Sequence, residues 1–255
     1  MDKILRIDMG GDGGPQVHEV PIGEYAGLGG RALTTAIIAK EVPATCHALG
    51  RENKLVIAPG LLSGTTAAMS GRISIGCKSP LTGGIKEANS GGQPSQVLAR
   101  LGYAAIVLEG QPASDDLYKV FINKDGVQIS VDNSLKMLPN YDLVDKMKSE
   151  YGDKKIACIS IGPAGEMKMC SASIACTDME IRPARHAGRG GVGAVMGAKN
   201  VKVIVLDDTG MGMRSPKDPE KFKDANKRFV DGLSSHPVTG EGLPAYGTNV
   251  LTNIL

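Results

Sequence analysis

A glycine-rich stretch with one arginine, residues 187–200, carries the residue types in this chain that are best suited to ligand chemistry. Four glycines and Arg189 fall between Gly188 and Gly193, where the pattern indicates the start of a helix. Glycine lets a ligand approach the backbone closely, and a helix start presents unpaired N–H groups to an anion. The guanidinium of Arg189 is shaped for phosphate. The stretch predicts a phosphate-bearing cofactor; the alternative is a tight strand-to-helix turn that binds nothing.

Other polar residues in glycine- or serine-rich loops suit the same kind of ligand. They are Arg72, Arg182 and Arg185, together with Asn89, which stands just before Gly91-Gly92 at an expected helix start. The Asn89 amide can donate to a phosphate or bind a hydrated magnesium ion, and several arginines converging would suit several phosphates. For any one of these arginines taken alone, a solvated loop is the alternative interpretation.

A dinucleotide site is a second, less favoured interpretation of the same glycines. The spacing Gly188-x-Gly190-x-x-Gly193 matches the NAD(P) fingerprint, and Asp207 or Asp208 follows about 20 residues on. The preceding segment 180–186 contains Pro183 and several charges, so we expect no strand running into the glycines. The expected helix before Val201 is also short for a dinucleotide crossover.

Composition limits the class of protein. The chain has 255 residues, 42% of them hydrophobic, which suffices for one large or two small domains. A net charge of +2 argues against nucleic-acid binding, and the absence of a long apolar run argues against a membrane span. Five cysteines without a C-x-x-C pair, and an N-terminus unlike a signal peptide, predict a reducing, cytoplasmic location.

Hydrophobic spacing predicts an α+β fold built from two similar halves. We expect strands at 3–9, 17–22, 54–58, 72–77, 104–109, 117–122, 127–131, 155–161, 167–175 and 201–206, and helices at 31–42, 89–101, 141–150, before Val201 and up to Val230. Gly91-Gly92, a short helix and strand 104–109 correspond to Gly190-Gly191, a short helix and strand 201–206. This repeat predicts a β-rich domain of two pseudo-twofold-related halves, about 1–110 and 111–208.

Residues 209–255 differ in composition and predict a linker followed by the start of a helical domain. Asp218-Pro219 caps a helix, 236–246 is loop-like, and a further helix begins at Thr248. Because the apolar pattern continues to Leu255 without a C-cap, we expect this chain to be one piece of a larger protein.

Several ordered motifs resemble the aldehyde ferredoxin oxidoreductase family over about residues 1–208. They are Ser70-Gly71-Arg72, the segment 78–84 (KSPLTGG), Asn89-Ser90-Gly91-Gly92 and the stretch 187–200, with Gly29-Gly30-Arg31 near the start. The resemblance implies the family's N-terminal domain, which holds a bis-pterin tungsten cofactor, with molybdenum as the alternative metal. In the family the pterin dithiolenes bind the metal, and protein side chains do not.

The resemblance also implies which residues contact that cofactor. The matching positions are Arg72, Asn89, Gly91, His186, Ala187, Gly188 and Arg189. Asn89 and the Ala187 backbone would lie near a magnesium ion that bridges the two pterin phosphates. The role of His186 stays open, because a lone histidine is more often structural.

The implied activity is the oxidation of a small aldehyde to its carboxylate, with ferredoxin or another electron carrier taking the electrons. The family's 4Fe-4S cluster is held by a C-x-x-C-x-x-x-C motif in later domains, which the cysteines of this chain do not match. We therefore expect missing C-terminal domains or a partner subunit, leave a homo-oligomer open, and expect this chain alone to be inactive. A non-catalytic pterin-binding or interaction subunit is the alternative, and the sequence identifies no catalytic acid or base.

Overall fold

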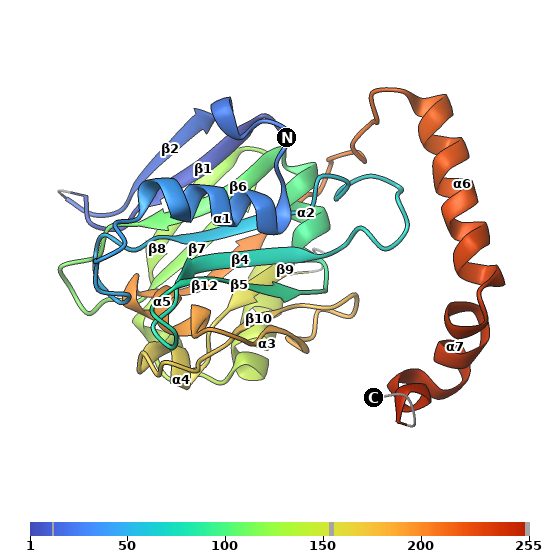
Figure 1. The fold of residues 1–255 in the computed structure, drawn as a ribbon. Coiled ribbons are helices and arrows are strands. Elements are labelled where there is room, and N and C mark those ends of the chain that lie inside the picture. The colour runs from blue at the N-terminus through green and yellow to red at the C-terminus, as the bar shows by residue number, and fades with distance from the viewer. Residues whose placement is uncertain (12, 153–155, 253–255) are drawn as a thin grey trace.

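Two six-stranded mixed sheets form the body of the molecule (Figure 1). The computed structural model describes residues 1–11, 13–152 and 156–252. Sheet A has the strand order β2-β1-β6-β3-β4-β5, and sheet B has the order β11-β10-β9-β12-β7-β8. The strands are β1 (Lys3–Asp8), β2 (Gln16–Pro21), β3 (Leu55–Pro59), β4 (Ile73–Lys78), β5 (Ile85–Ser90), β6 (Tyr103–Glu109), β7 (Tyr118–Asn123), β8 (Gly126–Val131), β9 (Ala157–Ser160), β10 (Ile174–Cys176), β11 (Arg185–Ala187) and β12 (Val201–Leu206).

The two sheets have the same topology. In each, a hairpin (β1 with β2, β7 with β8) pairs in parallel with the last strand of its half, β6 or β12. Three antiparallel pairings then lead to an edge strand, β5 in sheet A and β11 in sheet B. Both parallel pairs also shift register at their first residues. The predicted α+β class with duplicated halves is confirmed, whereas the boundaries of the domains stay a prediction.

Helices lie outside the sheets and between them. Helix α1 (Gly30–Glu41) packs on the outer face of sheet A, and α3 (Asn140–Tyr151) packs on the outer face of sheet B. The short helices α2 (Pro94–Arg100) and α5 (Val192–Ala198) contribute side chains to the core between the two sheets. A further turn of helix, α4 (Pro163–Glu166), contacts α5.

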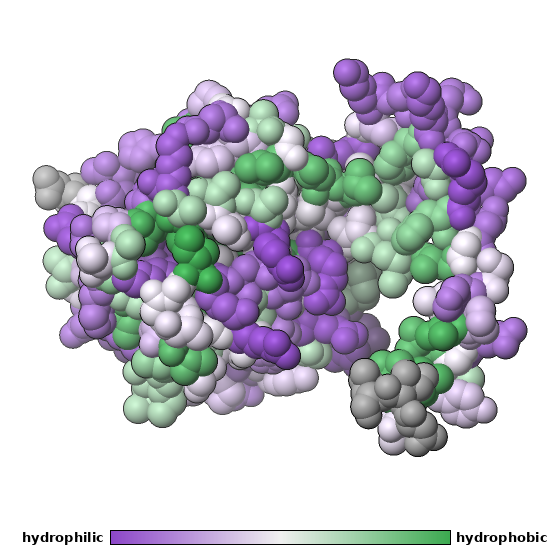
Figure 2. Space-filling model, in the orientation of Figure 1, coloured by the Kyte–Doolittle hydropathy of each residue, from purple (hydrophilic) through white to green (hydrophobic). Residues whose placement is uncertain are grey.

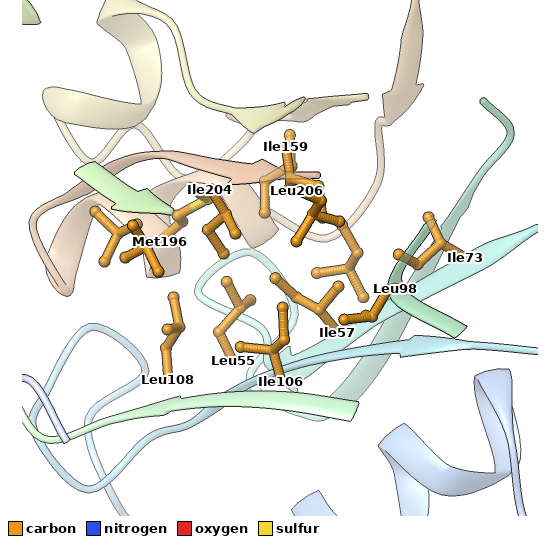
Figure 3. Packing of buried hydrophobic residues seen from close by; sticks show 14 of the residues in the cluster. Leu55, Ile57, Ile73, Leu98, Ile106, Leu108, Ile159, Met196, Ile204 and Leu206 are labelled. Atoms are coloured by element: carbon orange, nitrogen blue, oxygen red, sulfur yellow. The ribbon is translucent and has the colours of Figure 1, made fainter. Parts of the chain in front are cut away.

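The central core joins both halves (Figure 3). Leu55, Ile57 and Ile106 of sheet A face Ile204 and Leu206 of sheet B in one buried cluster. Alternate residues of β6 point the other way, into a second cluster under α1. This two-sided burial follows from the period of two along a strand and explains why the central strands are apolar throughout. Each fully buried Ile or Leu stabilises the fold by about 1.5–3 kcal/mol.

The C-terminal segment extends away from the two sheets (Figure 1). Helix α6 (Pro219–Ser235) begins at Asp218, whose Oδ1 accepts a bond from the Lys221 N–H at 3.1 Å. A π-helical turn (Pro237–Gly242), α7 (Leu243–Tyr246) and a 3-10 turn (Gly247–Leu251) follow. The loop between β3 and β4 reaches toward this segment: the Arg214 guanidinium donates to the Ser63 carbonyl at 2.7 Å. No helix in the part of the chain that the structure describes is long and apolar enough to cross a membrane.

Three expectations about elements are wrong. Asn89 lies in β5 and does not open a helix; α2 starts at Pro94, because proline at the first helical turn is the stronger start signal. The expected strand 167–175 contains only the start of β10, and Pro163 begins α4 before it. The segment 236–246 is helical and not loop-like. The expected strand start at Lys155 and the end of the last helix, residues 253–255, lie outside the described residues.

Candidate functional site

The edge strands of the two sheets, β5 and β11, lie side by side where the halves meet. Each leads to a glycine in the left-handed region, Gly92 with φ 103° and Gly190 with φ 78°. Counting back three residues from each glycine reaches Asn89 in β5 and Ala187 in β11. The strand registers make Asn89, which pairs with Ser74, equivalent to His186, which pairs with Ala175. Ala187 is equivalent to Ser90, so Asn89 and Ala187 stand one position apart in the duplicated fold.

A polar cavity of about 510 Å³ opens beside these edge strands. Its lining comes from both halves and consists of Arg31, Lys86, Glu87, Ala88, Asn89, His186, Gly188 and Arg189. Three of these side chains are lysine or arginine, and one is a carboxylate. Such a set favours an anion, because clustered N–H donors with positive charge bind phosphate or carboxylate oxygens strongly.

Arg72, Asn89 and Gly91 form one cluster at the edge of this cavity. The Arg72 Nε donates to the Asn89 Oδ1, and the Asn89 Nδ2 donates to the Ser74 Oγ at 3.1 Å. A Cβ placed on Gly91 would lie 3.5 Å from the Arg72 Nη1. Gly91 thus lies against the guanidinium at an ordinary contact distance, and the hydrogen bonds fix the Asn89 amide in one orientation.

Arg72 also lines a second cavity of about 690 Å³, which is mostly apolar. Leu61 and Met69, from the loop between β3 and β4, face Phe222 and Phe229 of α6 across this cavity. Figure 2 shows hydrophobic residues on the side of α6 that faces the sheets. Arg72 therefore stands between an apolar cavity and the polar cavity that Asn89 lines.

The second half contributes four consecutive candidate residues, from β11 and the turn after it. The His186 Nδ1 lies 3.0 Å from the Ser173 Oγ, and the ring also lines the polar cavity. Ala187 is buried and pairs with Ile174 of β10. A Cβ on Gly188 would meet no atom within 4 Å, and Arg189 is exposed beside it. This turn therefore offers open backbone and an exposed guanidinium to the cavity.

The glycines after Arg189 have a different role from the one expected. A Cβ on Gly191 would lie 2.0 Å from the Cys170 carbonyl oxygen, and one on Gly193 would lie 2.3 Å from that of Ser173. The Gly193 N–H donates to the Ala172 carbonyl at 2.9 Å. The start of α5 is buried against protein backbone, so the expectation that it faces an anion is wrong. Gly188 alone among the four glycines is open to a ligand.

The expected convergence of four arginines is also only partly right. Arg182 forms an ion pair with Asp178, with Nη2 and Oδ2 2.9 Å apart, and neither Arg182 nor Arg185 lines the polar cavity. Sequence reasoning missed Arg31, Lys86 and Glu87 as lining residues. Glu87 and Asn89 stand two apart in β5 and therefore share a face, but the assignment of this segment to a turn and a helix start concealed that pattern.

Residues 4–208 match the family model described as aldehyde ferredoxin oxidoreductase, N-terminal domain. The chain belongs to the aldehyde ferredoxin oxidoreductase family. Among its relatives is the tungsten-containing aldehyde ferredoxin oxidoreductase of Pyrococcus furiosus, which is 41% identical over 228 residues, 89% of this chain and 36% of the relative. The enzyme of the same name from Pyrococcus horikoshii is 38% identical over 257 residues, 99% of this chain and 40% of the relative.

A solved structure has the same fold. The active-site complex BamBC of benzoyl coenzyme A reductase, in complex with 1,5-dienoyl-CoA, superposes with a TM-score of 0.82 at 28% identity. The match covers 91% of this chain and 34% of that chain. The present chain thus spans 34% to 40% of the length of these relatives and of this solved structure.

Three of the five cysteines of this family member are poor metal ligands. Burial raises the pKa of the Cys77, Cys158 and Cys176 thiols to about 12, so they stay protonated at neutral pH. Cys46 is buried as well, and Cys170 is exposed. Within residues 1–11, 13–152 and 156–252, no three His, Cys, Asp or Glu side chains are grouped so as to hold a metal ion.

The topology of this aldehyde ferredoxin oxidoreductase domain disfavours the dinucleotide interpretation. Contrary to expectation, a strand (β11) does run into Gly188. However, β10 and β9 separate β11 from β12 in sheet B, and the intervening antiparallel pairings make β11 and β12 antiparallel. A dinucleotide-binding turn joins two parallel strands through a helix, and residues 185–206 form no such unit.

Proposed function

We propose that this chain is the cofactor-binding portion of a tungsten-pterin oxidoreductase that oxidises aldehydes to carboxylates, with ferredoxin as electron acceptor. Molybdenum is the alternative metal. One observation carries the proposal: Asn89 from one half and Arg189 from the other line a single cavity at the junction of the halves, with Arg72 hydrogen-bonded to Asn89.

The residues around the cavity fit a large anionic cofactor. Arg72 and Arg189 would neutralise its phosphates, and Gly91 and Gly188 leave the backbone open beside them. His186 and Ala187 complete the contact set on β11. The donor set contains no thiolate or metal-ligand cluster in the described ranges, which is compatible with a metal held by the cofactor's own sulfur atoms.

Magnesium is proposed to lie between the two halves. Asn89 and Ala187 lie on adjacent edge strands from the two halves, so their backbones can approach one ion from two sides. Mg²⁺ accepts oxygen ligands at octahedral positions and commonly combines phosphate oxygens with retained waters. An ion bridging two phosphates at this junction would tie one pterin to each half.

The bound cofactor would supply the two-electron step, in which an aldehyde and water give a carboxylate, three protons and two electrons. The residues of this chain bind and orient the cofactor and compensate its phosphate charge. The 4Fe-4S cluster and the substrate pocket would belong to further domains or to a partner subunit. Homo-oligomerisation is compatible with this arrangement.

The test is the metal and pterin content of the enzyme purified anaerobically from its source. We expect tungsten or molybdenum with two pterins per metal, and ferredoxin-dependent oxidation of aldehydes. Metal and pterin without aldehyde oxidation would favour the non-catalytic pterin-binding subunit. A fully folded protein with neither metal nor pterin would refute the proposal.

A further inference from the structure

Glu87 has one buried carboxylate oxygen without a partner. Its side chain is only 9% exposed, and Oε2 accepts from the Arg31 Nε at 3.1 Å. Among the described residues, no group donates a hydrogen bond to Oε1, which is buried. A buried polar atom left unpaired destabilises a fold, and buried carboxylate oxygens are normally satisfied. The atom therefore calls for a hydrogen-bond donor or a cation.

The surroundings of Glu87 indicate which kind of partner fits. Glu87 lies two residues before Asn89 in β5 and shares its face. It lines the same cavity as Lys86 and Arg189, whose charges favour an anion. A carboxylate in that place repels a bare phosphate, because like charges at close range interact unfavourably in a partly dry site. The repulsion becomes attraction when a divalent cation lies between the two groups.

We propose that Glu87 makes this cavity selective for a phosphate group that carries Mg²⁺. Oε1 contacts the ion or one of its waters, while Oε2 accepts from the exposed Arg31 guanidinium. Carboxylate and phosphate oxygens together are ligands that Mg²⁺ prefers. The inference rests on the proposed function, because it assumes that the cavity binds the cofactor's phosphates, and it adds a side chain from this chain to the Asn89 and Ala187 positions.

Pyrophosphate with and without Mg²⁺ serves as the probe. The full 255-residue chain is produced in a host grown without tungstate and molybdate, and binding is measured by calorimetry. For the wild type we expect Mg²⁺ to tighten pyrophosphate binding by at least about fivefold, the low end of ordinary coupling between two ligands. In Glu87→Gln the ratio of pyrophosphate affinities with and without Mg²⁺ should fall close to one. Pyrophosphate without Mg²⁺ should bind more tightly than it does to the wild type, because the repulsion between carboxylate and phosphate is gone.

Two control variants separate charge from shape. Glu87→Asp keeps the negative charge and should keep a clear preference for the magnesium complex. Glu220→Gln, on the exposed first turn of α6, removes a carboxylate outside the cavity and should behave as the wild type. Thermal unfolding establishes that each variant is folded before its binding is compared.

Three results would overturn the inference. They are a wild type without Mg²⁺ preference, a wild type that does not bind pyrophosphate at all, and a folded Glu87→Gln with the wild-type ratio. If Glu87→Gln does not fold, the Mg²⁺ effect on pyrophosphate binding in the wild type and in Glu87→Asp decides. Loss of the Mg²⁺ preference in Glu87→Asp, which keeps the charge, would also contradict the proposed role of Glu87. The metal and pterin content of the purified enzyme judges the proposed function separately from all of these outcomes.

Discussion

Gly197, the second-to-last residue of α5, should be intolerant of a side chain. A Cβ there would lie 1.9 Å from the Gly165 carbonyl oxygen and 2.8 Å from its carbon, where ordinary contact begins at 3.4 Å. Backbone on both sides must then move by more than an ångström. Overpacking of this kind costs about 1–3 kcal/mol, and we take the upper end because no flexible side chain can yield. The higher helix propensity of alanine relative to glycine offsets about 1 kcal/mol of this cost.

We therefore expect Gly197→Ala to lower the free energy of unfolding by about 2 kcal/mol, which for a chain of this size lowers Tm by about 4–8 °C. Thermal unfolding followed by circular dichroism measures this. Gly188→Ala is the matched control, because a Cβ there meets nothing within 4 Å and its φ lies outside the left-handed region. Its stability should stay within about 0.5 kcal/mol of the wild type. An unchanged Tm for Gly197→Ala, or an equal loss in both variants, would refute the packing argument.

Three further predictions concern charge and thiols. Arg189→Ala should lower the metal and pterin content while the fold survives, and Arg228→Ala, exposed on α6, should not; equal content in both variants would remove Arg189 from the site. Burial lowers the pKa of Lys199 from 10.5 to about 8, so its charged form disfavours the folded state below that pH. The stability of wild type relative to Lys199→Met, from urea denaturation, should therefore rise by about 3 kcal/mol between pH 8 and 10.5; a constant difference would contradict this. Iodoacetamide should label Cys170 well before the buried cysteines, as judged by mass spectrometry, since it alone is exposed; faster labelling of Cys77, Cys158 or Cys176 would contradict the burial.

The sequence was informative where a local pattern determines local structure. The Asn123-Lys124-Asp125-Gly126 turn and its alternating flanks predicted the β7–β8 hairpin, and the order of equivalent segments predicted the duplication. Strand β5 was missed because an edge strand with one exposed side carries little apolar alternation. The strand β11 has only three residues, a buried Ala187 after two exposed residues, and is too short to show the alternation of apolar and polar residues that predicts a strand.

In the candidate site, too, some residues could be predicted from the sequence, whereas others depend on tertiary contacts. The residue types of Arg72, Asn89 and Arg189 were sufficient to predict them as phosphate-binding residues, because guanidinium and amide groups donate hydrogen bonds to phosphate. Arg31 and Glu87 enter only through tertiary structure: α1 is laid across sheet A, and its first turn reaches β5. The packing role of Gly191 depends on the Cys170 backbone more than 20 residues earlier in the chain, a contact that no local pattern contains.

The position of the metal in the holoenzyme tests the central claim most directly. Crystals of the anaerobically purified protein, measured at the tungsten or molybdenum absorption edge, should give one anomalous peak at the junction of β5 and β11, with pterin density running to Asn89, Ala187 and Arg189. A metal peak away from this junction, with the polar cavity beside Arg189 free of pterin, would contradict the account.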